Sequence, residues 1–243
     1  SSTRSASVVR QVLREYGGVL LSDGYKAYDS YAREINHLIH AQCWAHTRRH
    51  FIEAECAEPR LVAEAVARFQ RLYDEERRLN QLGGAQKIQR RAERCKPIVD
   101  EFFLWLKRTL VDQLLLPSNP WTKAARYALD REKSLRVFLE YPDVPLDTNH
   151  LEREIRPIAL GRKNWLFCWT ELGAKDVGVF QSLIATCRLH GIDAYTYLVD
   201  VLQRIDQHPM AEVAMLTPRL WKDNFATDPL RSDLDRLRKN AES

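Results

Sequence analysis

The sequence predicts an α/β fold that is mostly helical. Two short apolar runs near the amino terminus flank a helical segment, a pattern typical of a parallel pair of strands joined by a crossover helix. Between residues 47 and 140 the apolar positions recur at helical spacing throughout. We therefore expect a small strand-containing core and a large all-helical block.

The first strand candidate is the apolar run Val19–Leu21, which precedes Asp23. A helical pattern over residues 7–16 comes before this strand and ends at two glycines. A short helix from about Tyr25 to Arg33 leads to the second strand candidate, His37–Gln42. Asp23 is therefore predicted to lie at the carboxyl end of a buried strand.

The helical block contains a series of amphipathic segments. Pro97 lies inside the longest of them, where its missing N–H and its ring predict a kink or a break. The expected helices cover residues 44–57, 60–80, 85–116, 120–129 and 131–140.

The region after the block begins with two prolines, which predict a loop, and Asn149 then offers a cap for a new helix. The predicted segments are a loop at 141–146, a short helix at 150–155, irregular or extended chain at 156–170, helices at 173–190 and 194–206, and a peripheral tail from residue 208.

Composition sets only broad limits on function. The 243 residues carry 37 basic and 33 acidic groups, and this net charge of +4 is too small to indicate a nucleic-acid partner. Five cysteines without CxxC spacing argue against a disulfide framework and favour a reducing cytosol. We expect no signal peptide, no membrane partner and a cytoplasmic location. The sequence has no glycine-rich phosphate loop and no GxSxG elbow.

Two carboxylates are candidates for cation binding. Ligands bind at the carboxyl ends of strands in open α/β sheets, where Asp23 offers oxygen ligands to a hard cation such as Mg²⁺. Taken alone, Asp23 is better explained as an ordinary turn residue before Gly24 than as a cation ligand. Glu152 shares one helical turn with Asn149 and Arg153, and it is equally well explained as the second half of a capping box.

Cys43 and His46 have half of the ligand spacing of a zinc site. His50 and Cys56 lie nearby, but no second pair has the usual spacing. A packing or hydrogen-bonding role is therefore favoured over zinc.

Basic residues cluster in three places. Arg48 and Arg49 follow the Cys43/His46 pair, and Lys87–Lys96 has a local charge of +4, which we interpret as a solvated helix face. The third cluster surrounds Glu152 and combines cations, which contact phosphates, with aromatic rings, which stack on unpaired bases. Its members are Arg153, Arg156, Arg162, Lys163 and Trp165.

Six stretches stand out by their order and spacing between residues 1 and 207. They are Leu21–Tyr28, Cys43–Phe51, Asn149–Pro157, Gly161–Phe167, Ser182–Cys187 and Gly191–Leu198. Together they resemble transposases of the insertion-sequence 66 family, which are of the DDE type.

The resemblance implies a ribonuclease-H-like catalytic fold with a helical insertion. Asp23 matches the second catalytic carboxylate and Glu152 the third, and both are implied ligands of two Mg²⁺ or Mn²⁺ ions. The basic residues Arg48, Arg49, Arg153, Arg156, Arg162 and Lys163 are implied phosphate contacts, and Trp165 an implied base contact. The implied partners are DNA of transposon ends and targets, other copies of the chain and accessory proteins of the same element.

On this interpretation residues 1–46 form a partial, truncated core with about two parallel strands, and 47–146 form the insertion. Residues 147–207 supply the closing helices and 208–243 a tail. The first catalytic Asp is expected to precede residue 1, so we expect this chain alone to be inactive. Two rival hypotheses are a non-catalytic DNA-binding or assembly remnant of a decayed element, and a helical scaffold without nucleic-acid function.

Overall fold

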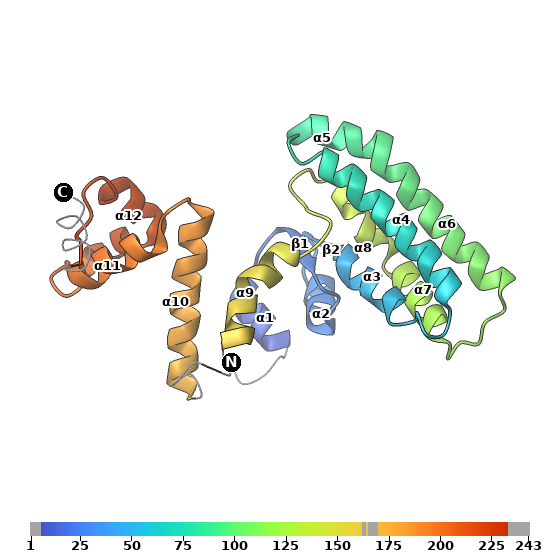
Figure 1. Ribbon diagram of the computed structural model, residues 1–243, viewed down its shortest axis with the longest axis horizontal. Coiled ribbons are helices and arrows are strands. Elements are labelled where there is room, and N and C mark those ends of the chain that lie inside the picture. Colours follow the sequence, from blue (N-terminus) through green and yellow to red (C-terminus); the bar gives the residue numbers. More distant parts are fainter. Residues whose placement is uncertain (1–5, 162–163, 165–169, 233–243) are drawn as a thin grey trace, which may run out of the picture. The chain divides into compact units, whose positions relative to one another are not determined.

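The computed structural model describes residues 6–161, 164 and 170–232, which form two compact units that divide between Leu151 and Glu152 (Figure 1). The first unit contains two parallel strands and a helical block, and it confirms the predicted mostly helical α/β class. Its elements are α1 (Ala6–Leu13), β1 (Gly18–Ser22), α2 (Lys26–Glu34), β2 (Leu38–Gln42), α3 (Trp44–Ile52), α4 (Pro59–Arg78), α5 (Gly84–Arg90), a π turn (Arg91–Cys95), α6 (Lys96–Asp112), α7 (Pro120–Asp130), α8 (Glu132–Arg136), a 3-10 turn (Val137–Leu139) and the start of α9 (Asn149–Gly161).

The two strands pair in parallel, with Gly18 opposite Leu38 and Ser22 opposite Gln42. Because side chains alternate between the faces of a strand, one face is apolar and packs against the helical block. The other face carries polar side chains together with Leu20 and Leu38. The apolar face contains Val19, Leu21 and Ala41, and the polar face contains Ser22, His40 and Gln42.

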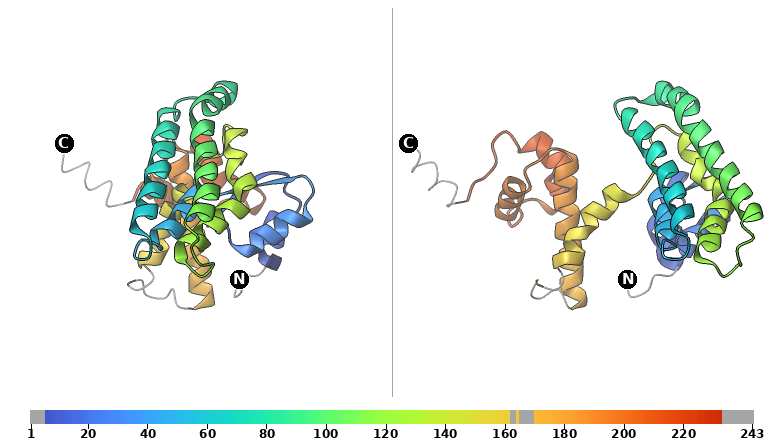
Figure 2. Two further views of the ribbon diagram at one scale, coloured as in Figure 1. Left: turned by 90° about the vertical axis from the view of Figure 1, so that its right-hand side faces the viewer. Right: turned by 45° about the vertical axis from the view of Figure 1, so that its right-hand side comes forward.

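Trp44 joins the sheet to the helical block. It is the first residue of α3, is only 2% exposed, and its indole N–H donates to the carbonyl of Leu135 at 2.8 Å. Its ring contacts aromatic rings from α4, α6 and the 3-10 turn, among them Phe69, Phe102 and Phe138. Figure 2 shows α4 and α6 side by side in this block.

The helix does not break at Pro97, because α5, the π turn and α6 follow one another without a gap. Helix α5 ends at Arg90, a π turn covers Arg91–Cys95, and α6 begins at Lys96. Pro97 therefore stands in the first turn of α6, where its missing N–H costs no helical hydrogen bond. A π turn changes which side chains face the core.

Arg91 is fully buried, so the expected solvated face at Lys87–Lys96 is wrong for this residue. Its Nε and Nη2 donate to the two carboxylate oxygens of Glu76. Nη1 donates to the carbonyls of Phe138 at 2.5 Å and Tyr141 at 2.8 Å, and Nη2 also donates to Val144 at 3.0 Å. All five N–H groups of the guanidinium therefore have acceptors, which a buried charge requires.

The second unit is a small helical assembly with its own core. Its elements are the remainder of α9, α10 (Glu171–Leu189), α11 (Ala194–Arg204), a 3-10 segment (Met210–Leu216) and α12 (Pro218–Asn224). Asp200 is buried at its centre and accepts hydrogen bonds from Trp221 Nε1 at 2.7 Å and from the N–H of Leu230 at 2.5 Å.

Two expectations for this region are wrong. Helix α9 continues through Pro157 to Gly161, although residues 156–170 were expected to be irregular, because a proline removes one backbone bond without always ending a helix. The tail beyond His208 is not peripheral, since Leu216 and Trp221 belong to the buried core.

We expect Arg91→Ala to lower the free energy of unfolding by about 3–5 kcal/mol. The substitution leaves the buried Glu76 carboxylate with Lys87 as its one remaining cation among the described residues, and it removes the donor to three loop carbonyls. Urea titration followed by circular dichroism measures the change. The matched control is Arg90→Ala, which removes an exposed pair with Glu93 and should change stability by less than about 1 kcal/mol. Equal midpoints for the two variants would show that the Arg91 guanidinium does not hold this region together.

Candidate functional site

Asp23 follows the last residue of β1 and begins the turn that leads to α2. Its side chain is exposed, and Oδ1 accepts a hydrogen bond from the N–H of Tyr25 at 3.0 Å. Gly24 has a φ of +81°, which favours glycine. Asp23 therefore lies at the carboxyl end of the strand, as predicted, and it stabilises the turn before Gly24. Among the described residues its Oδ2 has no hydrogen-bond partner, so this oxygen remains open to a cation.

Cys43 lies between β2 and α3, and its N–H donates to the carbonyl of Ser22 at 3.0 Å. The thiol is buried, 3.2 Å from Nδ1 of His46, and it accepts a hydrogen bond from Thr148 Oγ1 at 3.5 Å. No group of three His, Cys, Asp or Glu side chains suited to a metal occurs within the described ranges. These contacts give the Cys43/His46 pair a hydrogen-bonding role at the carboxyl ends of the strands.

The segment before α9 is bound to this same end of the sheet. The N–H of Trp44 donates to the carbonyl of Leu146 at 2.9 Å. The Tyr73 hydroxyl, from α4, donates to Oδ2 of Asp147 at 2.9 Å, while Oδ1 accepts from the N–H of Asn149 at 3.0 Å. Burial, followed by the negative charge of Asp147, raises the pKa of Tyr73, so its hydroxyl remains a donor.

Glu152 lies in the first turn of α9, and its side chain is exposed. It belongs to the second unit and Asp23 to the first, so the pairing of these two carboxylates stays a prediction. The rival carboxylate Glu154 accepts a hydrogen bond from Arg188 of α10 at 3.3 Å.

The basic residues predicted to contact DNA are exposed wherever the structure describes them. Arg48 and Arg49 lie on α3, and Arg153 and Arg156 lie on α9. The other predicted contacts, Arg162, Lys163 and Trp165, lie outside the described residues.

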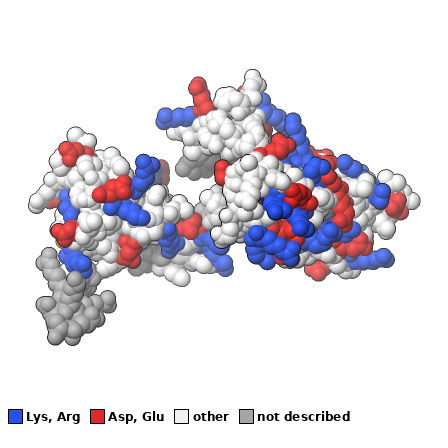
Figure 3. Space-filling view, turned by 90° about the horizontal axis from the view of Figure 1, so that it is seen from above, with Lys and Arg blue, Asp and Glu red and all other residues white. Residues whose placement is uncertain are grey.

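The Lys87–Lys96 cluster is largely neutralised by neighbouring carboxylates. Lys87 lies 3.3 Å from Glu76, and Lys96 lies 2.7 Å from Asp100. Figure 3 shows Lys and Arg interspersed with Asp and Glu over the first unit. A run of basic letters therefore overstates the positive charge of this surface.

Tyr127, from α7, is a site residue that the sequence analysis did not identify. A Cβ added to Gly24 would lie 2.2 Å from the Tyr127 hydroxyl, so the phenol reaches the Asp23 turn. The ring lies 4.2 Å from the ring of His50, and the guanidinium of Arg131 lies 3.8 Å from its centroid. No short-range pattern could have placed a tyrosine about a hundred residues downstream beside this turn.

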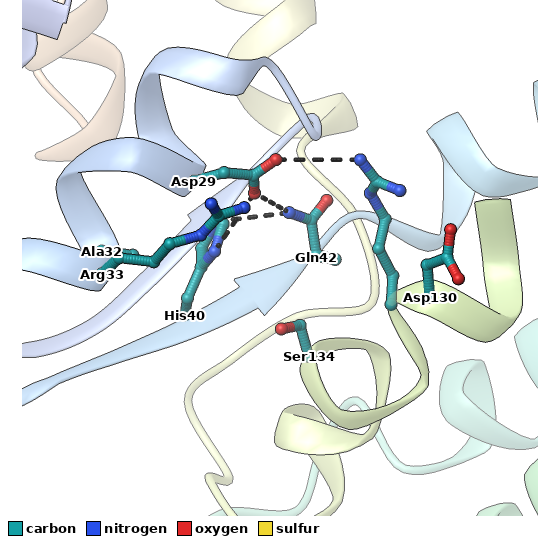
Figure 4. A pocket seen from close by; sticks show the side chains of 8 residues that line it. Asp29, Ala32, Arg33, His40, Gln42, Asp130 and Ser134 are labelled. Atoms are coloured by element: carbon teal, nitrogen blue, oxygen red, sulfur yellow. Dashed lines mark hydrogen bonds and ion pairs between the residues drawn. The ribbon is translucent and has the colours of Figure 1, made fainter.

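The polar face of the sheet carries a hydrogen-bonded network (Figure 4). His40 lies 2.8 Å from Ser22 Oγ and 3.5 Å from Asp29 Oδ1, and Gln42 Nε2 donates to Asp29 at 3.1 Å. The order Ser, His, Asp suggests a nucleophile, but Ser22 is only 4% exposed and inaccessible to a substrate. We interpret these contacts as structural links between α2 and the strands. Beside them lies a pocket of about 470 Å³, lined by Asp29, Ala32, Arg33, His40, Gln42, Asp130, Arg131 and Ser134.

No helix within the described residues is long and apolar enough to span a bilayer. The chain matches the family model described as "Transposase IS66 family" over residues 1–176, and the model "IS66 C-terminal element" over residues 182–218.

Two similar proteins from Sinorhizobium fredii (strain NBRC 101917 / NGR234) are the uncharacterized proteins y4hP and y4qI. Each is 33% identical to this chain, over 238 and 239 residues respectively. The matches cover 91% and 93% of this chain but 43% and 42% of the relatives, so the chain spans less than half of their length. No solved structure matches the chain.

Stability should depend on pH through His40 and His50. Burial is the largest influence and lowers the pKa of both histidines below the ordinary 6.5. The positive charge of Arg131 also lowers both pKa values. The negative charge of Asp29 raises the pKa of His40, and that of Glu53 raises the pKa of His50, without reversing the shift. The unfolded chain therefore binds more protons below pH 6.5, so this stability is present above 6.5 and is lost as pH falls toward the folded-state pKa values.

We expect the urea concentration at the midpoint of unfolding to be lower at about pH 5 than at about pH 7. The double variant His40→Asn, His50→Gln should show a smaller decrease. The control His208→Gln, in the second unit, should show the same decrease as the unmodified chain. If the double variant also shows the full decrease, the pH dependence of stability comes from other groups.

Proposed function

Because the chain belongs to the IS66 family of transposases, we propose that it contributes to metal-dependent DNA strand cleavage and strand transfer through Asp23 and Glu152. The observation that supports this proposal is the position of Asp23 at the carboxyl end of β1. The segment that starts α9 is bound beside the end of the neighbouring strand, through Thr148 and Cys43. Glu152 stands in the first turn of that helix.

The fold that accompanies this function is ribonuclease-H-like. In this proposal residues 1–46 form part of the catalytic core, 47–146 are a helical insertion, 147–207 are the closing helices and 208–243 the C-terminal tail. The parallel β1 and β2 pair, with the crossover helix α2, supports the first assignment.

The residues fit a hard divalent cation such as Mg²⁺ or Mn²⁺. Asp23 presents an exposed carboxylate oxygen, and oxygen ligands suit these ions. When bound, such an ion supplies activation of the attacking oxygen and stabilisation of the leaving oxygen of a DNA phosphodiester.

The protein groups bind and orient the nucleic acid around this carboxylate pair. Arg48 and Arg49 contact phosphates from α3, and Arg153 and Arg156 contact them from α9. Arg48 is close enough to the Tyr73–Asp147 pair to influence the pKa of Tyr73, so this positive charge stands near the start of α9.

We propose that Asp23 and Glu152 are two of the three carboxylates of a DDE site, and that the 243 residues alone do not cleave DNA. Two carboxylates leave a two-ion site one anionic ligand short. Mg²⁺-dependent nicking of plasmid DNA by the purified chain, abolished by Glu152→Gln, would contradict this.

Metal binding tests the carboxylate pair directly. Titration with Mn²⁺, followed by electron paramagnetic resonance, should give weak binding that Asp23→Asn and Glu152→Gln each reduce by about tenfold or more. Combining them should add little, because both remove ligands of one ion. The control Glu154→Gln, on the same helix, should leave Mn²⁺ affinity unchanged; an equal effect of Glu152→Gln and Glu154→Gln would refute the pairing.

Salt dependence tests the proposed phosphate contacts. The double variant Arg48→Ala, Arg49→Ala should weaken duplex DNA binding and reduce the slope of log affinity against log salt by about one unit per arginine. Fluorescence anisotropy with a labelled duplex measures both. Arg77→Ala, which removes an exposed arginine paired with Asp74, is the control and should change neither quantity.

A further inference from the structure

The Tyr127 hydroxyl is brought to the Asp23 turn from a distant part of the chain. Tyr127 lies on α7 in the helical block, and a Cβ added to Gly24 would lie 2.2 Å from its hydroxyl, so the phenol would have to shift to accept one. Burial is the largest cause of the raised pKa of Tyr127, and the negative charge of Asp23 contributes in the same direction.

The ring of Tyr127 is held in place by its neighbours. His50 from α3 lies 4.2 Å away, and the Arg131 guanidinium lies 3.8 Å from the ring centroid. Arg131 is itself positioned by Asp29, with Nη2 and Oδ2 3.7 Å apart. These contacts limit the motion of the phenol, so its hydroxyl is preorganised at the turn.

The hydroxyl has unused hydrogen-bonding capacity. Among the residues that the structure describes it has no hydrogen-bond partner, and Tyr127 is only partly buried. Burial raises the pKa of the phenol, and the Arg131 charge opposes this rise without reversing it. A neutral, positioned O–H beside a carboxylate turn is a donor suited to an anionic oxygen.

We propose that Tyr127 is a phosphate-binding residue of this site, whose hydroxyl donates a hydrogen bond to a non-bridging oxygen of a DNA phosphate held beside Asp23. This inference rests on the proposed function, because the phosphate is supplied by bound DNA. Arg131, next to the ring, adds positive potential that favours the same ligand. The helical block thus contributes directly to substrate binding in addition to supporting the sheet.

Substitution of Tyr127 by Phe keeps the ring between its neighbours and removes only the hydroxyl. Anisotropy with a short fluorescein-labelled duplex, without divalent metal, should show an affinity about 2- to 10-fold lower for Tyr127→Phe. The control Tyr16→Phe removes a hydroxyl at the other end of β1, where Tyr16 donates to the carbonyl of Val19 at 3.4 Å, and should bind like the unmodified chain.

A second readout does not depend on affinity. With 3-fluorotyrosine incorporated throughout, the ¹⁹F resonance that disappears in Tyr127→Phe identifies position 127, and this resonance should shift when duplex is added. If this resonance does not shift and the affinity for duplex is unchanged in Tyr127→Phe, Tyr127 packs against Gly24 and does not bind phosphate.

The two proposals fail in different ways. Loss of affinity in Arg48→Ala with none in Tyr127→Phe would overturn this inference and leave the proposed function standing. Affinity lowered by Tyr127→Phe, with Mn²⁺ binding insensitive to Asp23→Asn, would support the phosphate contact and overturn the metal-dependent function.

Discussion

The arrangement of the first unit depends on the hydrogen bonds that the buried guanidinium of Arg91 donates. After about a hundred residues of helix the chain must return to the sheet, and the returning loop presents carbonyl groups to a dry interior. Three of them, from Phe138, Tyr141 and Val144, accept hydrogen bonds from this one side chain. Without such donors these carbonyls would be buried and unsatisfied, which is costly. The Glu76 carboxylate balances the charge.

The route of that loop decides what lies at the carboxyl ends of the strands. Once residues 138–144 are fixed, Leu146 can pair with Trp44 and Thr148 with Cys43. The strand-end site is therefore assembled from segments far apart in sequence. Asp23 and Cys43 directly follow the two strands, Tyr127 comes from the helical block, and Thr148 precedes α9.

Local patterns predicted those parts that depend on local physics. The apolar run before Asp23 predicted a strand that ends at the carboxylate, and the structure has that strand. Arg91 could not be recognised in its basic run, because the π turn that directs it inward leaves no mark in charge or periodicity. Tyr127 was missed for a similar reason, since its role depends on α7 packing against α3. Helix α9 extends beyond the predicted end at residue 155 and continues through Pro157 to Gly161. The pairing of Asp23 with Glu152, the ions and the DNA contacts remain predictions.

The links that close the site also set the order in which the chain can fold. The bond from Trp44 to Leu135 joins residues 91 apart, and that from Thr148 to Cys43 joins residues 105 apart. Closing loops of this length costs chain entropy before the contacts stabilise the fold, so we expect these contacts to form after the local helical ones. During synthesis the ribosome must release most of the first unit before the two strand ends acquire their neighbours. Exposed strand edges can pair with other chains, so early compaction of the helical block would limit such pairing during synthesis.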